Sequence, residues 1–469
     1  MRSFLFITTL TLTPLALAEV AMPNCFGDHM VLQRETAVPI WGTADPGEAV
    51  SVTFAGQQRS TTADADGQWR VELAPLDASF EPQTLAVSGE NTLTFADVLV
   101  GEVWLCSGQS NMAWSVRRSN HAAVEIASAN FPAIRFLAVE KQAAQEPRDD
   151  FEGAWSVCTP ETVADFSAVG YFFGRRLHHA LGVPVGLIDN AWGGSAAEAW
   201  VPRDILAEAG IFEAYLADWD SRVDGFTDET QARLEAEYEA WVDAGRPGER
   251  RRRPRDPRYS QHRPANLYHG MLEPILGYGI RGTIWYQGES NSGRAEAYQT
   301  LFPLLIQTWR DAWGQSDFPF YWVQLADYRA EQEEAVAQDN WAELREAQTM
   351  TLRVPNTGEA VIIDAGEGRD IHPRDKQTVA NRLVRHALAK DYGFDLASES
   401  PRASEIRFED GAAVVTFDSI DEGLYAFDTR EIYGFTLAGN DGNFVFAEAE
   451  IIAPDTVRVR EVEALRVGF

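Results

Sequence analysis

The sequence predicts an α/β protein whose three-layer α/β/α core is flanked by β-sandwich-like regions. Between residues 101 and 394, short apolar runs alternate with amphipathic segments of helical spacing, an order typical of a parallel sheet with helices on both faces. The regions 19–100 and 395–469 instead contain closely spaced runs of β-branched and aromatic residues separated by turn residues, which indicates β-rich structure.

The N-terminal segment 1–18 has the layout of a signal peptide. Arg2 gives a positive start, an apolar stretch follows, and Ala16-Leu17-Ala18 forms a small-x-small cleavage site. The apolar run is too short and too rich in threonine for a membrane-spanning helix, so we expect a periplasmic or secreted protein. The chain has three cysteines, which allow at most one disulfide: Cys25, Cys106 and Cys158.

Residues 19–100 are predicted to form a small β-sandwich domain. Its strand patterns are AVSVTFAG (49–56), QWRVELAP (68–75) and NTLTFADVLV (91–100). Residues 395–469 are predicted to form a second β-rich region, with strand patterns at 412–419, 433–439, 443–452 and 456–461.

The core between these regions is predicted to contain five parallel strands, at 103–106, 185–190, 282–286, 320–326 and 360–366. Amphipathic helices are predicted between and after them, at 160–182, 294–314, 341–354 and 373–393. The stretch 215–265 is irregular, with one predicted helix and the basic run ERRRRPRDPR. Because this run is short, broken by proline and flanked by acidic residues, we interpret the stretch as a surface insertion.

The composition limits the classes of function. Of the 469 residues, 45% are hydrophobic and 11% aromatic, and the formal net charge is −31. The first two values are typical of a globular protein with a large core. The acidic excess argues against nucleic acids and anionic membranes as partners, because both require a basic surface. The sequence does not indicate an oligomeric state.

Four of the five predicted core strands are followed by glycine-rich or chemically reactive sequences. These are SGQSNM (107–112), AWGGSAAEAW (191–200), QGESNS (287–292) and EGRDIHPRDK (367–376). Because open α/β sheets bind ligands at the carboxyl ends of their strands, we expect these loops to form one site. Ser110 is the candidate nucleophile of an acyl-transfer reaction, although Met112 stands where the G-x-S-x-G pattern requires its second glycine.

A serine nucleophile needs an adjacent base, and His372 is the candidate. It is the histidine that closely follows a predicted sheet strand, whereas the others lie in predicted helices, in the N-terminal β-region or in other loops. Asp370 stands two residues earlier, and residues i and i+2 of an extended segment point to the same side. Its carboxylate is therefore predicted to orient the imidazole and to stabilise the imidazolium.

An acyl-transfer site also needs hydrogen-bond donors for the oxyanion of the tetrahedral intermediate. The predicted donors are the backbone N–H of Ser110 at a helix start, the backbone N–H of Gly193, and the side-chain amide of Gln287. The side chains predicted to contact substrate are those of Asn111, Glu289 and Asn291. HExxH, paired CxxC and GxxxxGK[ST] motifs are absent from the sequence, so neither a metal nor a cofactor is predicted.

The blocks GQSNM, WGGS, WYQGES and DIHP, in this order, resemble the SGNH-hydrolase superfamily and, more closely, the sialate O-acetylesterase family of carbohydrate esterases. The resemblance covers nearly the whole chain after the signal peptide. It implies a flavodoxin-like SGNH-hydrolase core, a serine nucleophile at Ser110, a base at His372, an oxyanion glycine at Gly193, no metal, and removal of acetyl groups from sugar hydroxyls.

Two positions depart from the superfamily pattern. The third block is usually G-x-N-D but reads QGESN here, so Gln287 is the substitute donor. The acid usually lies three residues before the histidine, where this chain has Arg369. Either Asp370 or another acid such as Asp364 must then orient His372.

We therefore expect a secreted carbohydrate O-acetylesterase that acts on an acetylated carbohydrate through an acyl-serine intermediate, with acetylated sialic acid as the first substrate. One alternative is an esterase for acetylxylan or another polysaccharide, and a second is a non-catalytic carbohydrate-binding protein. Trp114, Trp192 and Tyr286 are candidates for stacking on a sugar, although core packing is the commoner environment of tryptophan.

Overall fold

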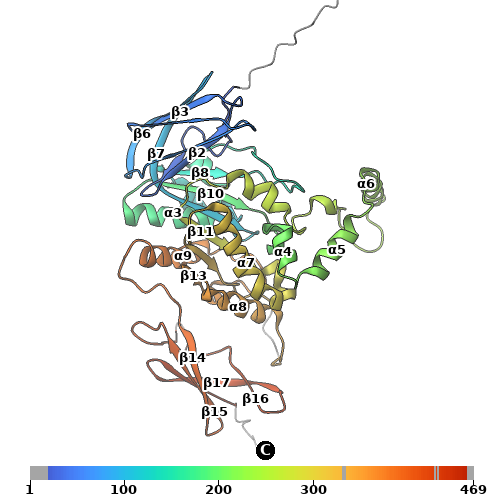
Figure 1. Ribbon diagram of the computed structural model, residues 1–469. Helices are drawn as coiled ribbons and strands as arrows, with labels where there is room; N and C mark the ends of the chain where they lie inside the picture. The colour runs from blue at the N-terminus through green and yellow to red at the C-terminus, as the bar shows by residue number, and fades with distance from the viewer. Residues whose placement is uncertain (1–18, 330–333, 427–428, 430–431, 462–469) are drawn as a thin grey trace, which may run out of the picture.

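The computed structural model describes residues 19–329, 334–426, 429 and 432–461. The predicted signal peptide, 1–18, lies outside the described residues. Figure 1 shows an N-terminal β-region, a central α/β layer structure and a C-terminal β-sheet that follow one another in chain order from top to bottom.

The central sheet has the strand order β13-β12-β11-β7-β10-β8-β9, in which only the edge strand β9 is antiparallel to its neighbour. The strands are β7 (Thr92–Gly108), β8 (Phe131–Ala138), β9 (Ser156–Cys158), β10 (Val185–Ala191), β11 (Gly282–Tyr286), β12 (Phe320–Val323) and β13 (Thr357–Ala360). Without β8 and the edge strand β9, the order is the flavodoxin-like 2-1-3-4-5. Because β7 lies between two strands that both follow it in sequence, its carboxyl end is a topological switch point.

Helices cover both faces of this sheet, which confirms the predicted three-layer α/β/α core. On one face, α3 (Ala168–Leu181) and α9 (Lys376–Lys390) bury Phe173 and Leu383 among the sheet residues. On the other face, α7 (Ala295–Trp313) and α8 (Asn340–Met350) bury Trp309 and Leu344. The short helices include η1 (Val116–Arg118), α1 (Ala122–Ala127), α2 (Pro160–Val163), η2 (Ala197–Trp200), α4 (Arg203–Glu208), η6 (Glu289–Arg294) and η8 (Ile363–Ala365).

Strand β7 is 17 residues long and belongs to both the N-terminal region and the core. Its first part pairs in parallel with β1 (Val31–Gln33) and in antiparallel with β6 (Ser79–Ser88). Its second part lies in the central sheet. The boundary predicted near residue 100 therefore falls inside a continuous strand. In the N-terminal region β3 (Ala49–Phe54) also pairs with β4 (Gln57–Thr62), and β2 (Val38–Thr43) pairs with β5 (Gln68–Leu73) in a separate sheet.

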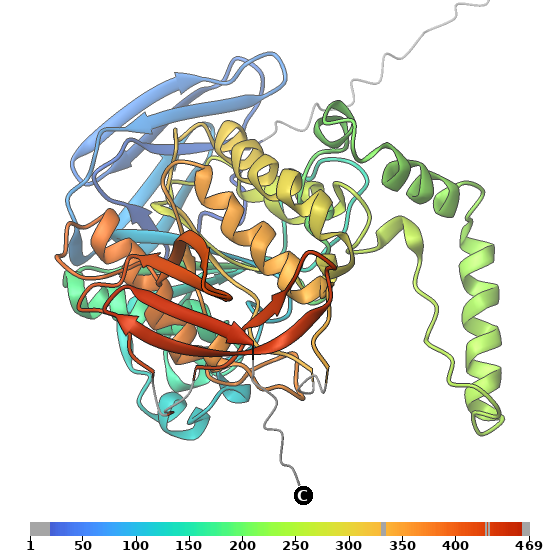
Figure 2. The same ribbon diagram turned by 90° about the horizontal axis from the view of Figure 1, so that it is seen from below.

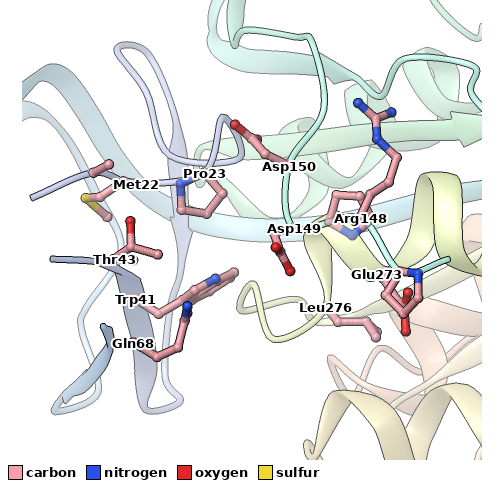
Figure 3. Close-up of a pocket in the computed structure, with 14 residues that line it drawn as sticks. Met22, Pro23, Trp41, Thr43, Gln68, Arg148, Asp149, Asp150, Glu273 and Leu276 are labelled. Atoms are coloured by element: carbon pink, nitrogen blue, oxygen red, sulfur yellow. The ribbon is translucent and has the colours of Figure 1, made fainter. Parts of the chain in front are cut away.

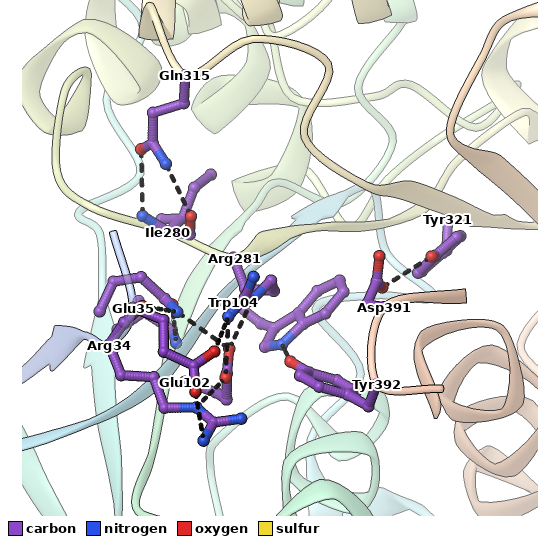
Figure 4. Close-up of polar contacts among 12 residues, drawn as sticks. Arg34, Glu35, Glu102, Trp104, Ile280, Arg281, Gln315, Tyr321, Asp391 and Tyr392 are labelled. Carbon is purple, nitrogen blue, oxygen red and sulfur yellow. Dashed lines mark hydrogen bonds and ion pairs between the residues drawn. The ribbon is translucent and has the colours of Figure 1, made fainter. Parts of the chain in front are cut away.

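A buried carboxylate on β7 joins the N-terminal region to the core (Figure 4). Glu102 is fully buried and accepts hydrogen bonds from Gln33 Nε2 at 3.1 Å, Arg34 Nε at 2.5 Å and Arg281 Nε at 2.9 Å. Burial alone would raise the pKa of this carboxyl, but the bonds and charges of Arg281 and Arg34 outweigh burial and lower it. Glu102 is therefore an ionised acceptor for donors from two segments that are far apart in sequence, residues 33–34 and Arg281.

The insertion predicted at 215–265 projects from the body of the molecule, as Figure 2 shows. It contains two helices rather than one, α5 (Glu213–Val223) and α6 (Asp228–Asp243). The C-terminal region is a single antiparallel sheet of order β14-β15-β18-β17-β16 rather than a sandwich. Its strands are β14 (Arg402–Glu409), β15 (Ala412–Asp418), β16 (Thr436–Ala438), β17 (Phe444–Ala453) and β18 (Thr456–Glu461).

Several core elements differ from the sequence prediction. Strands β8 and β9 were not predicted, and the last core strand is β13, which ends before the stretch 363–365 that forms the turn η8. The helix predicted over 160–182 is broken, because Thr159 and Ser167 each cap a new helix start with their side-chain oxygens.

The three cysteines are buried and free. Over the described ranges, no helix has both the length and the apolar character needed to cross a membrane.

Candidate active site

Ser110 lies in a tight turn directly after β7, at the switch point of the sheet. The backbone N–H groups of Met112 and Ala113 both donate to Gln109 O, so Ser110 begins a turn rather than the predicted helix. Gly108 is required at the end of the strand: its φ is +133°, and a Cβ there would lie 2.3 Å from Tyr286 O. This close approach lets Gln109 N donate to Tyr286 O and fixes the turn against β11.

The structure brings Ser110 and His372 together. The Nε2 atom of His372 lies 2.9 Å from Ser110 Oγ, within hydrogen-bond distance. His372 belongs to the loop between η8 and α9, and its ring stacks on Trp114 with a centroid separation of 4.9 Å and an angle of 17°. The candidate nucleophile and base are therefore held by two different strand-end loops, and the ring plane of His372 is fixed by stacking.

Asp370 is the carboxylate next to His372. Its Oδ1 atom lies 3.5 Å from His372 Nδ1 and accepts a hydrogen bond from the backbone N–H of His372 at 2.9 Å. About half of the Asp370 side chain is exposed. The alternative acid, Asp364, is instead paired with Arg382 through both carboxylate oxygens, at 2.5 Å and 2.6 Å. Of the two candidates, only Asp370 is placed to orient the imidazole.

Gly193 lies against Ser110, the candidate nucleophile. A Cβ built on Gly193 would lie 3.4 Å from Ser110 Cβ and 3.7 Å from Ser110 Cα. The loop that carries this glycine is tied to the end of β7, because Trp192 N and Ser195 Oγ both donate to Gly108 O. The backbone at Gly193 thus borders the space in front of Ser110, where an oxyanion donor must lie.

Gln287 does not present its amide to this space, contrary to the sequence prediction. The side chain is fully buried, and Nε2 donates to Ser195 O at 3.1 Å and to Asn291 Oδ1 at 2.7 Å. Its Oε1 atom accepts from Tyr298 Oη at 3.0 Å. Both amide hydrogens are used, so Gln287 ties the second and third strand-end loops together and has no donor left for an oxyanion.

Asn111 also differs from its predicted role in substrate contact. It is 1% exposed, and its Nδ2 atom donates to Glu289 Oε1 at 2.5 Å and to Ile371 O at 3.0 Å. Its Oδ1 atom accepts from Lys376 Nζ at 2.6 Å. All the hydrogen-bonding atoms of the amide are occupied, so Asn111 instead fixes the backbone immediately before His372.

Glu289 and Asn291, also predicted to contact substrate, lie within buried hydrogen-bond networks. Glu289 bonds Asn111, while its Oε2 atom is buried without a partner. Asn291 accepts from Ala197 N at 3.0 Å and donates to Glu198 Oε2 at 2.9 Å. Glu198 in turn forms an ion pair with Arg294 at 3.0 Å. These side chains hold the loops in register rather than line an open site.

Lys376 is a site residue that the sequence did not reveal. Its side chain is fully buried at the start of α9, and Nζ lies 5.1 Å from the Tyr286 ring centroid and 5.8 Å from that of Trp114. Burial lowers the pKa of Lys376 to about 7 and raises the pKa of Glu289. A lysine at a helix start is ordinarily solvated, and the only sequence signal was its position four residues after His372.

The electrostatic environment favours a neutral His372. Burial is the main cause that lowers the pKa of its imidazole, and the positive charges of Lys376 and Arg118 act in the same direction. Asp370 acts in the opposite direction and does not outweigh them. A neutral imidazole can accept the Ser110 proton, which is the state that a general base requires.

Two of the three aromatic residues predicted to stack on a sugar are buried. Tyr286 has no exposed surface and Trp114 is 6% exposed, whereas Trp192 is partly exposed.

A separate cavity of about 450 Å³ lies between the N-terminal β-region and the core (Figure 3). None of the residues lining it belongs to the four strand-end loops. Within the described residues, no group of three or more His, Cys, Asp or Glu side chains could hold a metal ion.

Comparison with known proteins identifies relatives across most of the chain. A family model described as carbohydrate esterase, sialic acid-specific acetylesterase matches residues 100–232 and 259–391. The sialate O-acetylesterase of Mus musculus is 32% identical over 435 residues, which are 83% of this chain and 77% of that protein. The Homo sapiens enzyme of the same name is 32% identical over 420 residues, which are 81% and 72% of the two chains.

A solved structure shows the same fold. The crystal structure of a carbohydrate acetylesterase from Xanthomonas citri superposes with a TM-score of 0.80 at 34% identity, covering 94% of this chain and 91% of that one. The protein is thus an esterase of the hydrolase class, and the chain belongs to the sialic acid-specific acetylesterase family of carbohydrate esterases.

Proposed function

We propose that the protein is a secreted sialate O-acetylesterase that removes acetyl groups from sugar hydroxyls through an acetyl-serine intermediate. The single observation that carries the mechanism is the 2.9 Å contact between Ser110 Oγ and His372 Nε2 at the switch point of the sheet. The 32% identity to sialate O-acetylesterases over most of the chain supports the substrate class.

In the first half of the reaction, Ser110 Oγ attacks the acetyl carbonyl carbon while His372 Nε2 accepts the hydroxyl proton. The negative charge that develops on the carbonyl oxygen is stabilised by the backbone N–H groups of Ser110 and Gly193. The intermediate then collapses: the bond from the carbonyl carbon to the sugar oxygen breaks, and His372 donates its proton to that oxygen. The acetyl group remains on Ser110.

In the second half, a water molecule replaces the sugar alcohol next to His372. The imidazole removes a proton from this water, which attacks the acetyl-serine carbonyl. Collapse of the second tetrahedral intermediate breaks the bond to Ser110 Oγ, and His372 returns the proton to the serine. Acetate leaves, and the enzyme is restored.

The proposal is tested by acetate release from acetylated sialic acid, acetylated xylan and an aryl acetate. The wild type is expected to be most active on acetylated sialic acid, and Ser110→Ala is expected to lose activity on all three. Ser128→Ala, which alters an exposed serine after α1, is the matched control, and circular dichroism verifies folding. Turnover by folded Ser110→Ala at the wild-type rate would refute the mechanism, and a preference for xylan would refute the substrate.

Export is the second part of the proposal and rests on the layout of residues 1–18. The protein recovered from the periplasm or medium is expected to begin after Ala18, as measured by intact mass. Recovery of the full-length chain from the cytoplasm alone would contradict it.

A further inference from the structure

An arginine covers the far side of the ring on which the catalytic histidine stacks. The guanidinium carbon of Arg118 lies 3.5 Å from the Trp114 ring centroid, and the His372 ring lies nearly parallel to Trp114 with its centroid at 4.9 Å. Two planar groups at these distances cannot share one face without overlap, so Arg118 and His372 cover opposite faces. The 6% exposure of Trp114 agrees with this arrangement.

The backbone that carries Arg118 is fixed next to the loop of the base. Trp114 Nε1 donates to Arg118 O at 2.9 Å, and Asn120 N donates to Arg374 O at 2.9 Å. The stack and these two bonds hold the guanidinium in one place before any ligand arrives, which lowers the conformational entropy lost on binding.

The charge of Arg118 is not neutralised by the protein. The side chain is exposed, and in the part of the chain that the structure describes no carboxylate lies within ion-pair distance of it. Its neighbours differ in this respect: Arg117 pairs with Asp165 at 2.5 Å, and Arg374 pairs with Glu367 at 3.1 Å. An oriented guanidinium without a carboxylate partner can bind a carboxylate through two parallel hydrogen bonds.

In the proposed reaction the sugar lies beside the imidazole, and Arg118 lies across the Trp114 ring from that imidazole. His372 must donate its proton to the departing sugar oxygen, so the sugar lies beside the imidazole, whereas the carbonyl oxygen points toward Gly193. Arg118 is separated from the imidazole only by the Trp114 ring. A carboxylate on the sugar would otherwise meet a chain of net charge −31, which on average repels anions.

We propose that Arg118 binds the carboxylate of an acidic sugar and thereby makes the esterase select acetylated sialic acids over neutral acetylated sugars. This inference rests on the proposed function and assigns its substrate selectivity to one residue. Arg118 is a binding residue, because it takes no part in proton transfer or in acyl transfer.

The test compares an O-acetylated sialic acid with the same molecule in which the carboxylate is replaced by a neutral carboxamide. For the wild type, kcat/KM is expected to be about tenfold higher for the acid, a ratio that corresponds to one exposed charge-assisted pair. Arg118→Gln is expected to abolish the difference, mainly through a higher KM for the acid. Arg118→Lys, which keeps the charge but loses the planar pair of donors, is expected to retain part of the ratio.

Arg369→Gln is the matched control, because Arg369 is an exposed arginine on the loop of His372. This variant is expected to keep the wild-type ratio. A salt titration adds an independent measurement, since KM for the acid should rise with ionic strength in the wild type more than in Arg118→Gln.

The inference is overturned if Arg118→Gln keeps the wild-type ratio, or if Arg369→Gln removes it instead. Its failure differs from failure of the proposed function. If Ser110→Ala is inactive while the ratio does not depend on Arg118, the acetylesterase mechanism stands and only the assignment of Arg118 falls.

Discussion

His372 Nε2 lies 2.9 Å from Ser110 Oγ although 262 residues separate the two in sequence. The contact forms because both residues follow parallel strands, so their loops meet at one edge of the sheet. Buried hydrogen bonds then fix the loops: Asn111 holds Ile371 O, and Trp114 stacks on the imidazole. The pair is thus positioned by the framework of the site before substrate binds.

The first prediction concerns the pH dependence of kcat/KM. The imidazole of His372 must be neutral to accept a proton, and burial lowers its pKa from the ordinary 6.5. Activity is therefore expected to rise with pH through a midpoint below 6.5 and to be complete at neutral pH. The measurement is kcat/KM for an aryl acetate between acid and neutral pH. A midpoint above 6.5 would contradict the assignment of His372 in its buried environment.

Lys376→Met is expected to move this midpoint to higher pH. Lys376, whose pKa is about 7, is protonated over the acid limb, and its charge lowers the pKa of His372. The substitution also removes the donor to Asn111, so kcat is expected to fall about tenfold through loss of positioning.

Lys390→Met is the control, because Lys390 is on the same helix but pairs with Glu399 at 2.6 Å, outside the site. A loss of activity in Lys376→Met without a shift in the pH midpoint would contradict the effect of the Lys376 charge on His372. Lys376 would then act only by positioning Asn111.

Asp370→Asn is expected to lower kcat/KM by about 10- to 100-fold, which is a smaller loss than removal of Ser110 or His372 would cause. The reason is that Asp370 is half exposed and lies 3.5 Å from the ring nitrogen. Asp364→Asn, which breaks the pair with Arg382, is expected to change stability but not kcat/KM. The reverse order of effects would identify Asp364 as the orienting acid.

Gly193→Val is expected to lower kcat by about 10²-fold, comparable to loss of one oxyanion donor. Even a Cβ at this position lies 3.4 Å from Ser110 Cβ, so a larger side chain must displace the backbone or fill the space for the substrate oxygen. Gly293→Val is the comparison, since a Cβ there meets no atom within 4 Å. Equal kinetics for the two variants would remove Gly193 from the site.

Glu102→Gln is expected to lower the free energy of unfolding by about 3 kcal/mol at pH 7, because it leaves two arginines of a buried cluster without their shared charge. The pKa of Glu102 is lowered on folding from the ordinary 4.5, so its stabilisation is present above about 4.5 and is lost as pH falls through the folded-state value.

Denaturant unfolding at several pH values should therefore show the two proteins converging in acid. Glu35→Gln, which alters a carboxylate that is 53% exposed and also paired with Arg281, should cost less than about 1 kcal/mol. An equal loss of unfolding free energy in Glu102→Gln and Glu35→Gln would contradict the claim that burial makes the Glu102 pairs more stabilising than the exposed pair of Glu35.

The sequence predicted the layers and the four strand-end loops because both depend on local patterns. Apolar runs that alternate with amphipathic helices define the sheet, and chain order then places the loops at one edge. Strand β8 was not predicted, because Pro132 and Arg135 interrupt its apolar run. Arg135 is accommodated by an ion pair with Asp97 at 2.6 Å, a long-range partner that a local pattern does not reveal.

The roles of the amides could not be predicted in the same way. Asn111, Gln287 and Asn291 occur in the expected loops, but a hydrogen bond depends on side-chain direction, which no spacing rule gives for a turn. Each amide is turned inward and bonded to a neighbouring loop. The buried position of Lys376 depends on Asn111 and Glu289 in the same way, since burial of a charge requires partners that come from other loops.

The central claim is that Ser110 carries the acetyl group during turnover. Rapid acid quenching of the wild type with an aryl acetate, followed by mass spectrometry of the digested protein, measures this directly. We predict that one acetyl group is found on the peptide containing Ser110, and that neither Ser110→Ala nor unreacted wild type carries it. Acetate release by the wild type at full rate with no acetylated Ser110 peptide at any quench time would contradict the account.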